Sequence, residues 1–61
     1  MIIEALNNGK IIKWNVGQPR YYAKVDGIFY FSDTPNNVDS WRKSAIKECT
    51  IKAHEKDFKI I

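Results

Sequence analysis

The sequence predicts a small α+β protein, an antiparallel β-sheet of two hairpins with one helix near Val38–Glu48. Two turn-forming pairs, Asn8-Gly9 and Asp26-Gly27, each stand between segments rich in β-branched and aromatic residues, a pattern typical of β-hairpins. After residue 37 the apolar residues change from a strand-like to a helical spacing. The 61 residues have room for a single domain, 1–61, with one small core.

Four strands are expected, and they span Ile2–Leu6, Lys10–Val16, Arg20–Val25 and Ile28–Ser32. Asn, Asp and Gly tolerate the positive φ of tight hairpin turns, and the first such turn would place Glu4 opposite Lys13. Pro19 has no backbone N–H and ends the second strand, so the segment 17–19 separates the two hairpins. Together the hairpins would form an open sheet or a partly closed barrel.

The Asp26-Gly27 turn also sets which side chains share a face of the sheet. If these two residues form the centre of the turn, Val25 faces Ile28 and the pairing continues outward one residue at a time. Because side chains alternate between faces, one face carries Arg20, Tyr22, Lys24, Phe29 and Phe31. The other face carries Tyr21, Ala23, Val25, Ile28 and Tyr30.

A helix is expected from about Val38 to Glu48. The apolar residues of this segment share a helical spacing and are Val38, Trp41, Ala45 and Cys49. Asn37 or Asp39 would cap the N-terminus of the helix, since short polar side chains accept hydrogen bonds from its first N–H groups. The apolar stripe must dock on one face of the sheet, with Cys49 as a small buried group.

Residues 50–61 admit two interpretations. Thr50–His54 alternates like a strand, and Phe58–Ile61 could form another strand. Ala53 also continues the apolar stripe, so the helix could run on to Lys56. The two β-branched residues at 50 and 51 favour the strand.

The residue types that catalysis and metal binding need are scarce. Cys49 is the only cysteine and His54 the only histidine, too few for a disulfide or a four-ligand zinc site. The three glycines stand at separate turns rather than in a phosphate-binding loop. We therefore expect a protein that is not an enzyme, holds no metal or cofactor, and works in the reducing cytoplasm.

A membrane partner is not expected either. Residues 1–6 lack the basic region of a signal peptide, and Glu4 interrupts their short apolar run. No segment approaches the roughly 18 apolar residues that a membrane-spanning helix needs.

The strongest functional signal is the interleaving of aromatic and basic residues on the face that carries Tyr22. Flat rings stack on bases while cations meet phosphates, so this pattern indicates single-stranded nucleic acid as the ligand. Trp14 would join from the neighbouring hairpin, and basic residues of the helix would add phosphate contacts. The expected binding residues are Trp14, Arg20, Tyr22, Lys24, Phe29, Phe31, Arg42, Lys43 and Lys47.

The same rings could instead belong to the core. A chain of this size needs its large apolar groups inside, and the helix must cover one face of the sheet. If it covers the face with Tyr22, Phe29 and Phe31, those rings become core and Tyr21 and Tyr30 are exposed.

The segment Gly9–Phe31 resembles cold-shock domains. Its opening GKIIKWN looks like the family's first strand, G-x-V-K-W-F-N, while YAKV sits in place of F-G-F-I and IFYF in place of V-F-V-H. The sequence departs from the family in lacking the Phe after Trp14, in Lys24 replacing the second ring, and in Phe31 replacing the His.

That family is a five-stranded OB-type barrel that binds single-stranded RNA or DNA through its aromatic residues. The resemblance therefore implies the same ligand class and stacking roles for Trp14, Tyr22, Phe29 and Phe31.

The sequence also supports a second function, binding of a host protein. Small single domains rich in Ile, Lys and Asn look like accessory proteins of bacteriophages and mobile elements, which often block a host enzyme, nuclease or toxin. The only charged residues of the middle segment 26–41, which lies between two basic segments, are Asp26, Asp33 and Asp39, and they could form an interface beside exposed aromatic rings. Unpaired strand edges could also allow homo-oligomers. Basic residues that converge on one surface would favour nucleic acid, and separate charged poles would favour a protein partner.

Overall fold

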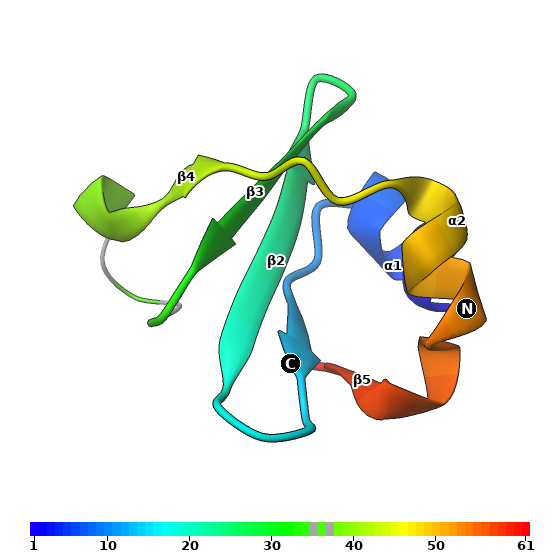
Figure 1. The fold of residues 1–61 in the computed structure, drawn as a ribbon. Coiled ribbons are helices and arrows are strands. Elements are labelled where there is room, and N and C mark those ends of the chain that lie inside the picture. Colours follow the sequence, from blue (N-terminus) through cyan, green and yellow to red (C-terminus); the bar gives the residue numbers. More distant parts are fainter. Residues whose placement is uncertain (35, 37) are drawn as a thin grey trace.

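Three strands in the middle of the chain form the centre of the sheet. In a computed structural model, which describes every residue except 35 and 37, β1 (Ile12–Trp14), β2 (Arg20–Val25) and β3 (Ile28–Ser32) pair antiparallel in chain order. Two short strands lie at the edges, β4 (Arg42–Lys43) beside β3 and β5 (Phe58–Ile60) beside β1. The order β4-β3-β2-β1-β5 makes an open sheet, and the α+β class is confirmed (Figure 1).

The hairpin of β2 and β3 has the predicted turn and register. Asp26 and Gly27 have φ of 52° and 80°, as the favoured two-residue turn requires. The paired residues are Tyr22 and Phe31, Ala23 and Tyr30, Lys24 and Phe29, and Val25 and Ile28. The predicted division of these side chains between the two faces is therefore confirmed.

The predicted strand Ile2–Leu6 is wrong, because this segment forms helix α1 (Ile2–Asn7). Its buried residues follow a helical spacing at positions 2, 5 and 6. Gly9, with φ of 81°, donates its N–H to the Leu6 carbonyl, and Lys10 donates to the Ala5 carbonyl. These two bonds form a Schellman cap, so Asn8-Gly9 ends a helix and does not turn a hairpin.

Two further predictions about the first hairpin are wrong because that strand is absent. Glu4 lies in α1 and does not pair with Lys13, whose strand partners are Tyr21 and Lys59. The segment 17–19 connects paired strands β1 and β2 and does not separate two hairpins, so β1, β2 and β3 form a meander.

The predicted helix Val38–Glu48 is also wrong. The segment holds a short 3-10 helix, η1 (Val38–Ser40), and then β4, while the helix α2 spans Glu48–Ala53. Backbone pairing overrides the helical spacing here, because β4 pairs with β3 and the Ser44 N–H donates to the Phe29 carbonyl at 2.9 Å. The predicted cap at Asn37 lies outside the described residues.

The C-terminal segment follows both interpretations in part. Helix α2 takes in Ala53, so the strand expected at Thr50–His54 is wrong, and the strand near Phe58–Ile61 is confirmed as β5. A second 3-10 helix, η2 (Glu55–Asp57), joins α2 to β5. Cys49 is exposed, contrary to expectation, because α2 turns Ile51 into the core instead.

The core lies between the two helices and one face of the sheet. Five buried side chains form it, and they are Ile2, Leu6, Ile12, Ile51 and Phe58. Figure 1 shows α1 and α2 together on the side of β1 and β5, far from β4. Ile12 shares a face with its partner Tyr22, so the helices cover the face that carries Tyr22. Among the described residues, neither α1 nor α2 packs on the opposite face of the sheet, where the 3-10 helix η1 reaches only the corner at Ser32.

Replacement of Ile51 tests this docking. Ile51 is 0% exposed, so Ile51→Ala should lower the free energy of unfolding by about 2–4 kcal/mol, and Ile51→Val by about 1 kcal/mol. Ile61→Ala is the control, since Ile61 is 60% exposed and should change stability by less than about 0.5 kcal/mol. Urea unfolding followed by tryptophan fluorescence measures the change, and equal midpoints for all three variants would contradict the packing.

Candidate binding surface on the sheet

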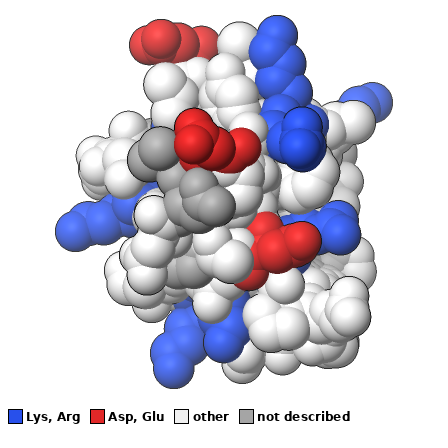
Figure 2. All heavy atoms as spheres, turned by 90° about the vertical axis from the view of Figure 1, so that its left-hand side faces the viewer, with Lys and Arg blue, Asp and Glu red and all other residues white. Residues whose placement is uncertain are grey.

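The basic residues expected to bind do not converge on one surface. Lys43 pairs with Tyr30, whereas Arg42 pairs with Phe31, so these two neighbours lie on opposite faces. Lys47 is exposed at the N-cap of α2. Viewed from the side of β4, Lys and Arg side chains project at several separate places with Asp and Glu between them (Figure 2). The visible face therefore has neither one basic patch nor opposite charged poles.

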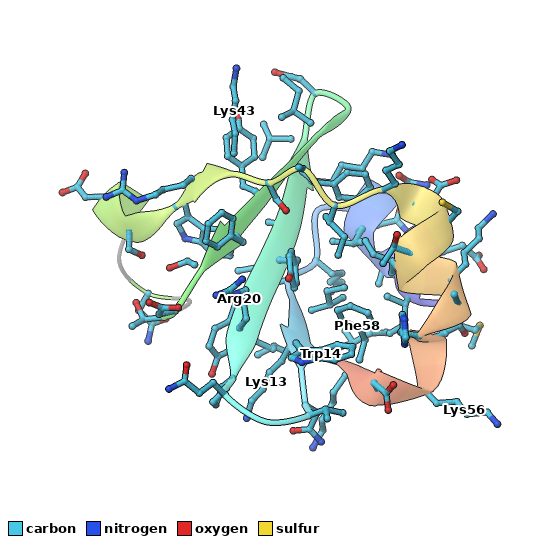
Figure 3. All side chains as sticks on the ribbon, viewed as in Figure 1. Lys13, Trp14, Arg20, Lys43, Lys56 and Phe58 are labelled. Carbon is cyan, nitrogen blue, oxygen red and sulfur yellow. The ribbon has the colours of Figure 1, made fainter. Side chains whose placement is uncertain are left out.

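Three of the four predicted stacking rings pack against the core. Trp14, Tyr22 and Phe29 are partly buried beside it. The centroid of the Phe58 ring lies 5.0 Å from that of Trp14 (Figure 3). It lies 5.8 Å from that of Tyr22, and both contacts are edge contacts. These rings help to hold the helices on the sheet, so only the parts of Trp14 and Tyr22 that line surface hollows remain accessible to a ligand.

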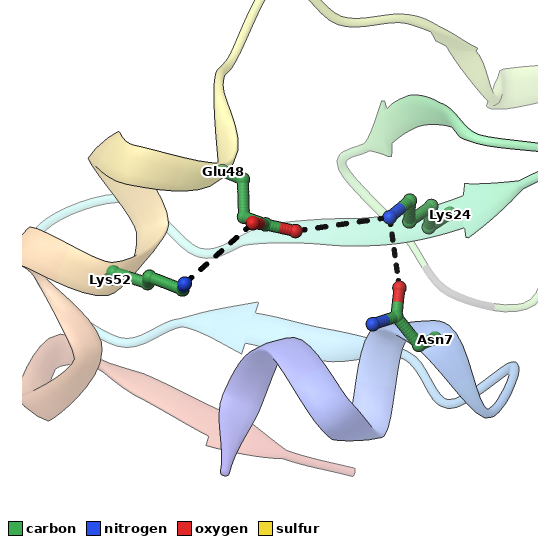
Figure 4. Close-up of polar contacts among 4 residues, drawn as sticks. All are labelled: Asn7, Lys24, Glu48 and Lys52. Carbon is green, nitrogen blue, oxygen red and sulfur yellow. Dashed lines mark hydrogen bonds and ion pairs between the residues drawn. The ribbon is translucent and has the colours of Figure 1, made fainter.

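Lys24 also has an internal role. Its Nζ donates a hydrogen bond to Asn7 Oδ1 at 2.8 Å and lies 3.9 Å from Glu48 Oε1 (Figure 4). It lies 5.3 Å from the centroid of the Phe29 ring, and the Lys24 side chain is only 22% exposed. Lys24 therefore ties β2 to both α1 and α2, and its charge is already neutralised in part.

Arg20, Phe31 and Arg42 form a small patch at the β3–β4 end of the helix-covered face. The Arg20 guanidinium lies 5.0 Å from the centroid of the Phe31 ring, a cation–π contact, and Arg42 is the strand partner of Phe31. Phe31 is half-buried and stands outside the core cluster. A neighbouring surface hollow brings together three members of the predicted set, because Trp14, Arg20 and Tyr22 all line it.

The sheet face without a helix carries a second group of aromatic and basic residues. We call it the open face, and it consists of Lys13, Tyr21, Ala23, Val25, Ile28, Tyr30, Lys43 and Lys59. Tyr21 and Tyr30 are half-buried, and Val25 and Ile28 are 54% and 40% exposed. One corner is closed, because Ser32 is buried and its hydroxyl contacts that of Ser40.

Each tyrosine of the open face has a lysine directly opposite it on a neighbouring strand. Lys13 is the partner of Tyr21 across β1 and β2, and Lys43 is the partner of Tyr30 across β3 and β4. Tyr21 and Tyr30 are themselves diagonal neighbours, since Tyr21 pairs with Ser32, two residues beyond Tyr30. The two rings thus lie between flanking lysines.

The strands contribute only positive charge. Every charged residue in β1 to β5 is basic, and these residues are Lys13, Arg20, Lys24, Arg42, Lys43 and Lys59. The acidic residues lie in the helices, turns and loops. Within the described part of the chain, none of the three open-face lysines makes an ion pair. Their charge is therefore available to an anionic ligand.

Sequence reasoning put Tyr21 and Tyr30 on this face but did not select them. The signal was present, because the register that grouped Tyr22 with Phe31 also placed the other two tyrosines together. Lys13 and Lys59 were missed for a different reason. Their neighbourhood comes from the pairing of β1 with β5, which joins residues far apart in the sequence.

Other features of the described residues point to no catalytic or metal centre. A shallow apolar hollow beside α2 is lined by Trp14, Tyr22, Ile46, Thr50, His54 and Phe58. No three His, Cys, Asp or Glu side chains cluster among the described residues. None of the helices in the described part of the chain has the length and apolar character to span a membrane. Comparison with protein-family models, curated proteins and solved structures finds no match to this chain.

Lys24→Gln distinguishes an internal role for Lys24 from a ligand-binding one. Loss of its contacts to Asn7 and Glu48 should lower the free energy of unfolding by about 1 kcal/mol, because one hydrogen bond and one partly screened ion pair disappear. Lys47→Gln removes the same charge at an exposed position and should change stability by less than about 0.5 kcal/mol. Thermal or urea unfolding measures both variants, and equal stability of the two would contradict the internal role.

Proposed function

We propose that the protein is a non-enzymatic module that binds single-stranded nucleic acid through the open face. One observation carries the proposal: two tyrosines flanked by lysines lie on the sheet face opposite α1 and α2. Rings of this kind stack on unpaired bases, and lysines meet the phosphates between them. The ligand class is the one that the sequence indicated, but the surface is the opposite face of the sheet.

The electrostatics of the sheet support the proposal. The strands hold six basic and no acidic residues, and the chain carries a net charge of +3. A nucleic acid strand laid across the open face would meet Lys13 and Lys59 near one edge and Lys43 near the other. Affinity that depends on such contacts falls as the salt concentration rises.

The resemblance to cold-shock domains is compatible with this ligand but points to other rings. It implies stacking on Trp14, Tyr22, Phe29 and Phe31, of which the first three are held against the core. Tyr21 and Tyr30 offer the same chemistry without any cost in core packing. We therefore assign the stacking role to these two tyrosines.

A protein partner is the second candidate, and one observation favours it. Val25 and Ile28 expose apolar side chains at the turn end of the open face, beside Asp26. With the tyrosines they would form an apolar interface for a host enzyme, nuclease or toxin in the cytoplasm. Val25→Lys separates the two functions, because it should abolish capture of a protein and leave nucleic acid binding intact or stronger.

Self-association is a further form of protein binding to be measured at the same time. The edge strands β4 and β5 have two and three residues, which leaves few unpaired backbone groups for strand addition. Size-exclusion chromatography with mass measurement, with and without an oligonucleotide, reports the oligomeric state and nucleic acid binding together.

Alanine replacement of the open-face tyrosines tests the proposed function. Tyr21→Ala and Tyr30→Ala should each weaken binding of a labelled oligothymidylate by about 1–3 kcal/mol, since each removes one stacking platform. Tyr21→Phe and Tyr30→Phe keep the ring and should bind within about threefold of the original protein.

Fluorescence anisotropy at low salt measures these affinities, and Phe31→Ala, on the other face, is the matched control. The proposal would be wrong if the original protein fails to bind, or if the alanine variants bind as tightly as it does.

A further inference from the structure

The pairing of β1 with β5 places two lysines directly opposite each other. Lys13 and Lys59 are strand partners on the open face, because their neighbours Trp14 and Phe58 point into the core side. The Asn15 N–H donates to the Asp57 carbonyl at 2.9 Å, and the Ile61 N–H donates to the Ile11 carbonyl at 3.0 Å. In an antiparallel ladder every second residue pair is hydrogen-bonded. The pairs Asn15–Asp57 and Ile11–Ile61 are hydrogen-bonded, so Lys13–Lys59, halfway between them, is also such a pair, with Cα atoms about 5.5 Å apart.

Two like charges in this position destabilise a sheet unless something offsets them. Neither lysine makes an ion pair with any described residue. The acidic residue closest to Lys59 in sequence is Asp57, and its Oδ2 lies 3.7 Å from His54 Nδ1. Lys13 is half-buried and Lys59 is exposed. The described residues of the protein therefore supply no anion that would offset the two positive charges.

We propose that Lys13 and Lys59 together bind a single phosphate group of the nucleic acid strand, an inference that rests on the function proposed above. Two ammonium groups donate charge-assisted hydrogen bonds to the oxygens of one phosphate, and its charge relieves their mutual repulsion. Tyr21 lies directly beside Lys13 on the next strand. The phosphate at the lysine pair thus belongs to the nucleotide next to the base on Tyr21.

Lys43 is not part of this site. It projects from β4, which β2 and β3 separate from the strand β1 that carries Lys13 (Figure 3). Its partner is Tyr30, so it meets a different phosphate of the same strand. The site of shared binding is limited to the two lysines that face each other.

A double-mutant cycle tests whether one phosphate is shared. Lys13→Gln and Lys59→Gln should each weaken oligothymidylate binding about threefold to tenfold at low salt, and replacement of both should reduce the salt slope by about 0.7 in total, the value for one phosphate. The double variant should lose less than the product of the two single effects, because both side chains contact one group. Lys56→Gln is the matched control, since Lys56 projects from η2 away from the sheet (Figure 3).

The outcomes separate this inference from the proposed function. If the protein binds but the two losses multiply, the lysines hold different phosphates and the shared site is wrong. If Lys56→Gln weakens binding as much as the other two, the site is equally wrong. If the protein does not bind the oligonucleotide but inorganic tripolyphosphate raises its melting temperature through these lysines, the anion site stands and the nucleic acid function is overturned. Failure of both ligands overturns both proposals.

Stability gives a second readout that needs no ligand. Lys13→Gln or Lys59→Gln should raise the melting temperature by about 1–4 °C at low salt, because removal of either charge ends the repulsion across the ladder. The gain should disappear at high salt, where the repulsion is screened. Lys56→Gln should give no such gain, and an equal rise in that variant would contradict the charge arrangement.

Discussion

The packing of α1 and α2 on Ile12 decides which surfaces the protein can use. A chain of 61 residues has enough apolar mass to cover one face of its sheet, and Leu6, Ile12 and Ile51 are almost fully buried where the helices meet that face. Once this face is covered, Trp14, Tyr22 and Phe29 serve the core. The rings that lie outside this packing are Tyr21 and Tyr30 of the opposite face and Phe31 on the covered face.

Sequence reasoning succeeded where local chemistry decides the structure. Asp26-Gly27 has no alternative to a tight turn between two β-rich segments, so its register and face assignments were predictable. Asn8-Gly9 is a similar turn-forming pair but ends a helix, because Ile2, Ala5 and Leu6 form a helical stripe. A pair of this kind suits both roles, and only packing against the sheet chooses between them.

The rest of the fold, and with it the candidate site, depends on contacts between distant segments. Strand β4 forms because the edge of β3 offers backbone partners, and β5 pairs with a strand more than forty residues earlier. Tyr21 and Tyr30 were predictable as neighbours, whereas the facing of Lys13 and Lys59 was not. The result is a sheet whose charged strand residues are all basic. One face packs against α1 and α2, and the other is the open face.

The most direct test of the open face uses the three tyrosines as reporters on its two sides. Tyr21 and Tyr30 lie on the open face and Tyr22 on the covered one, so their ring resonances can be followed by NMR during titration with an oligothymidylate at low salt. Binding at the open face predicts large shifts for the rings of Tyr21 and Tyr30 and little change for Tyr22. Shifts concentrated on Tyr22 and Trp14, or none on any tyrosine, would contradict the account.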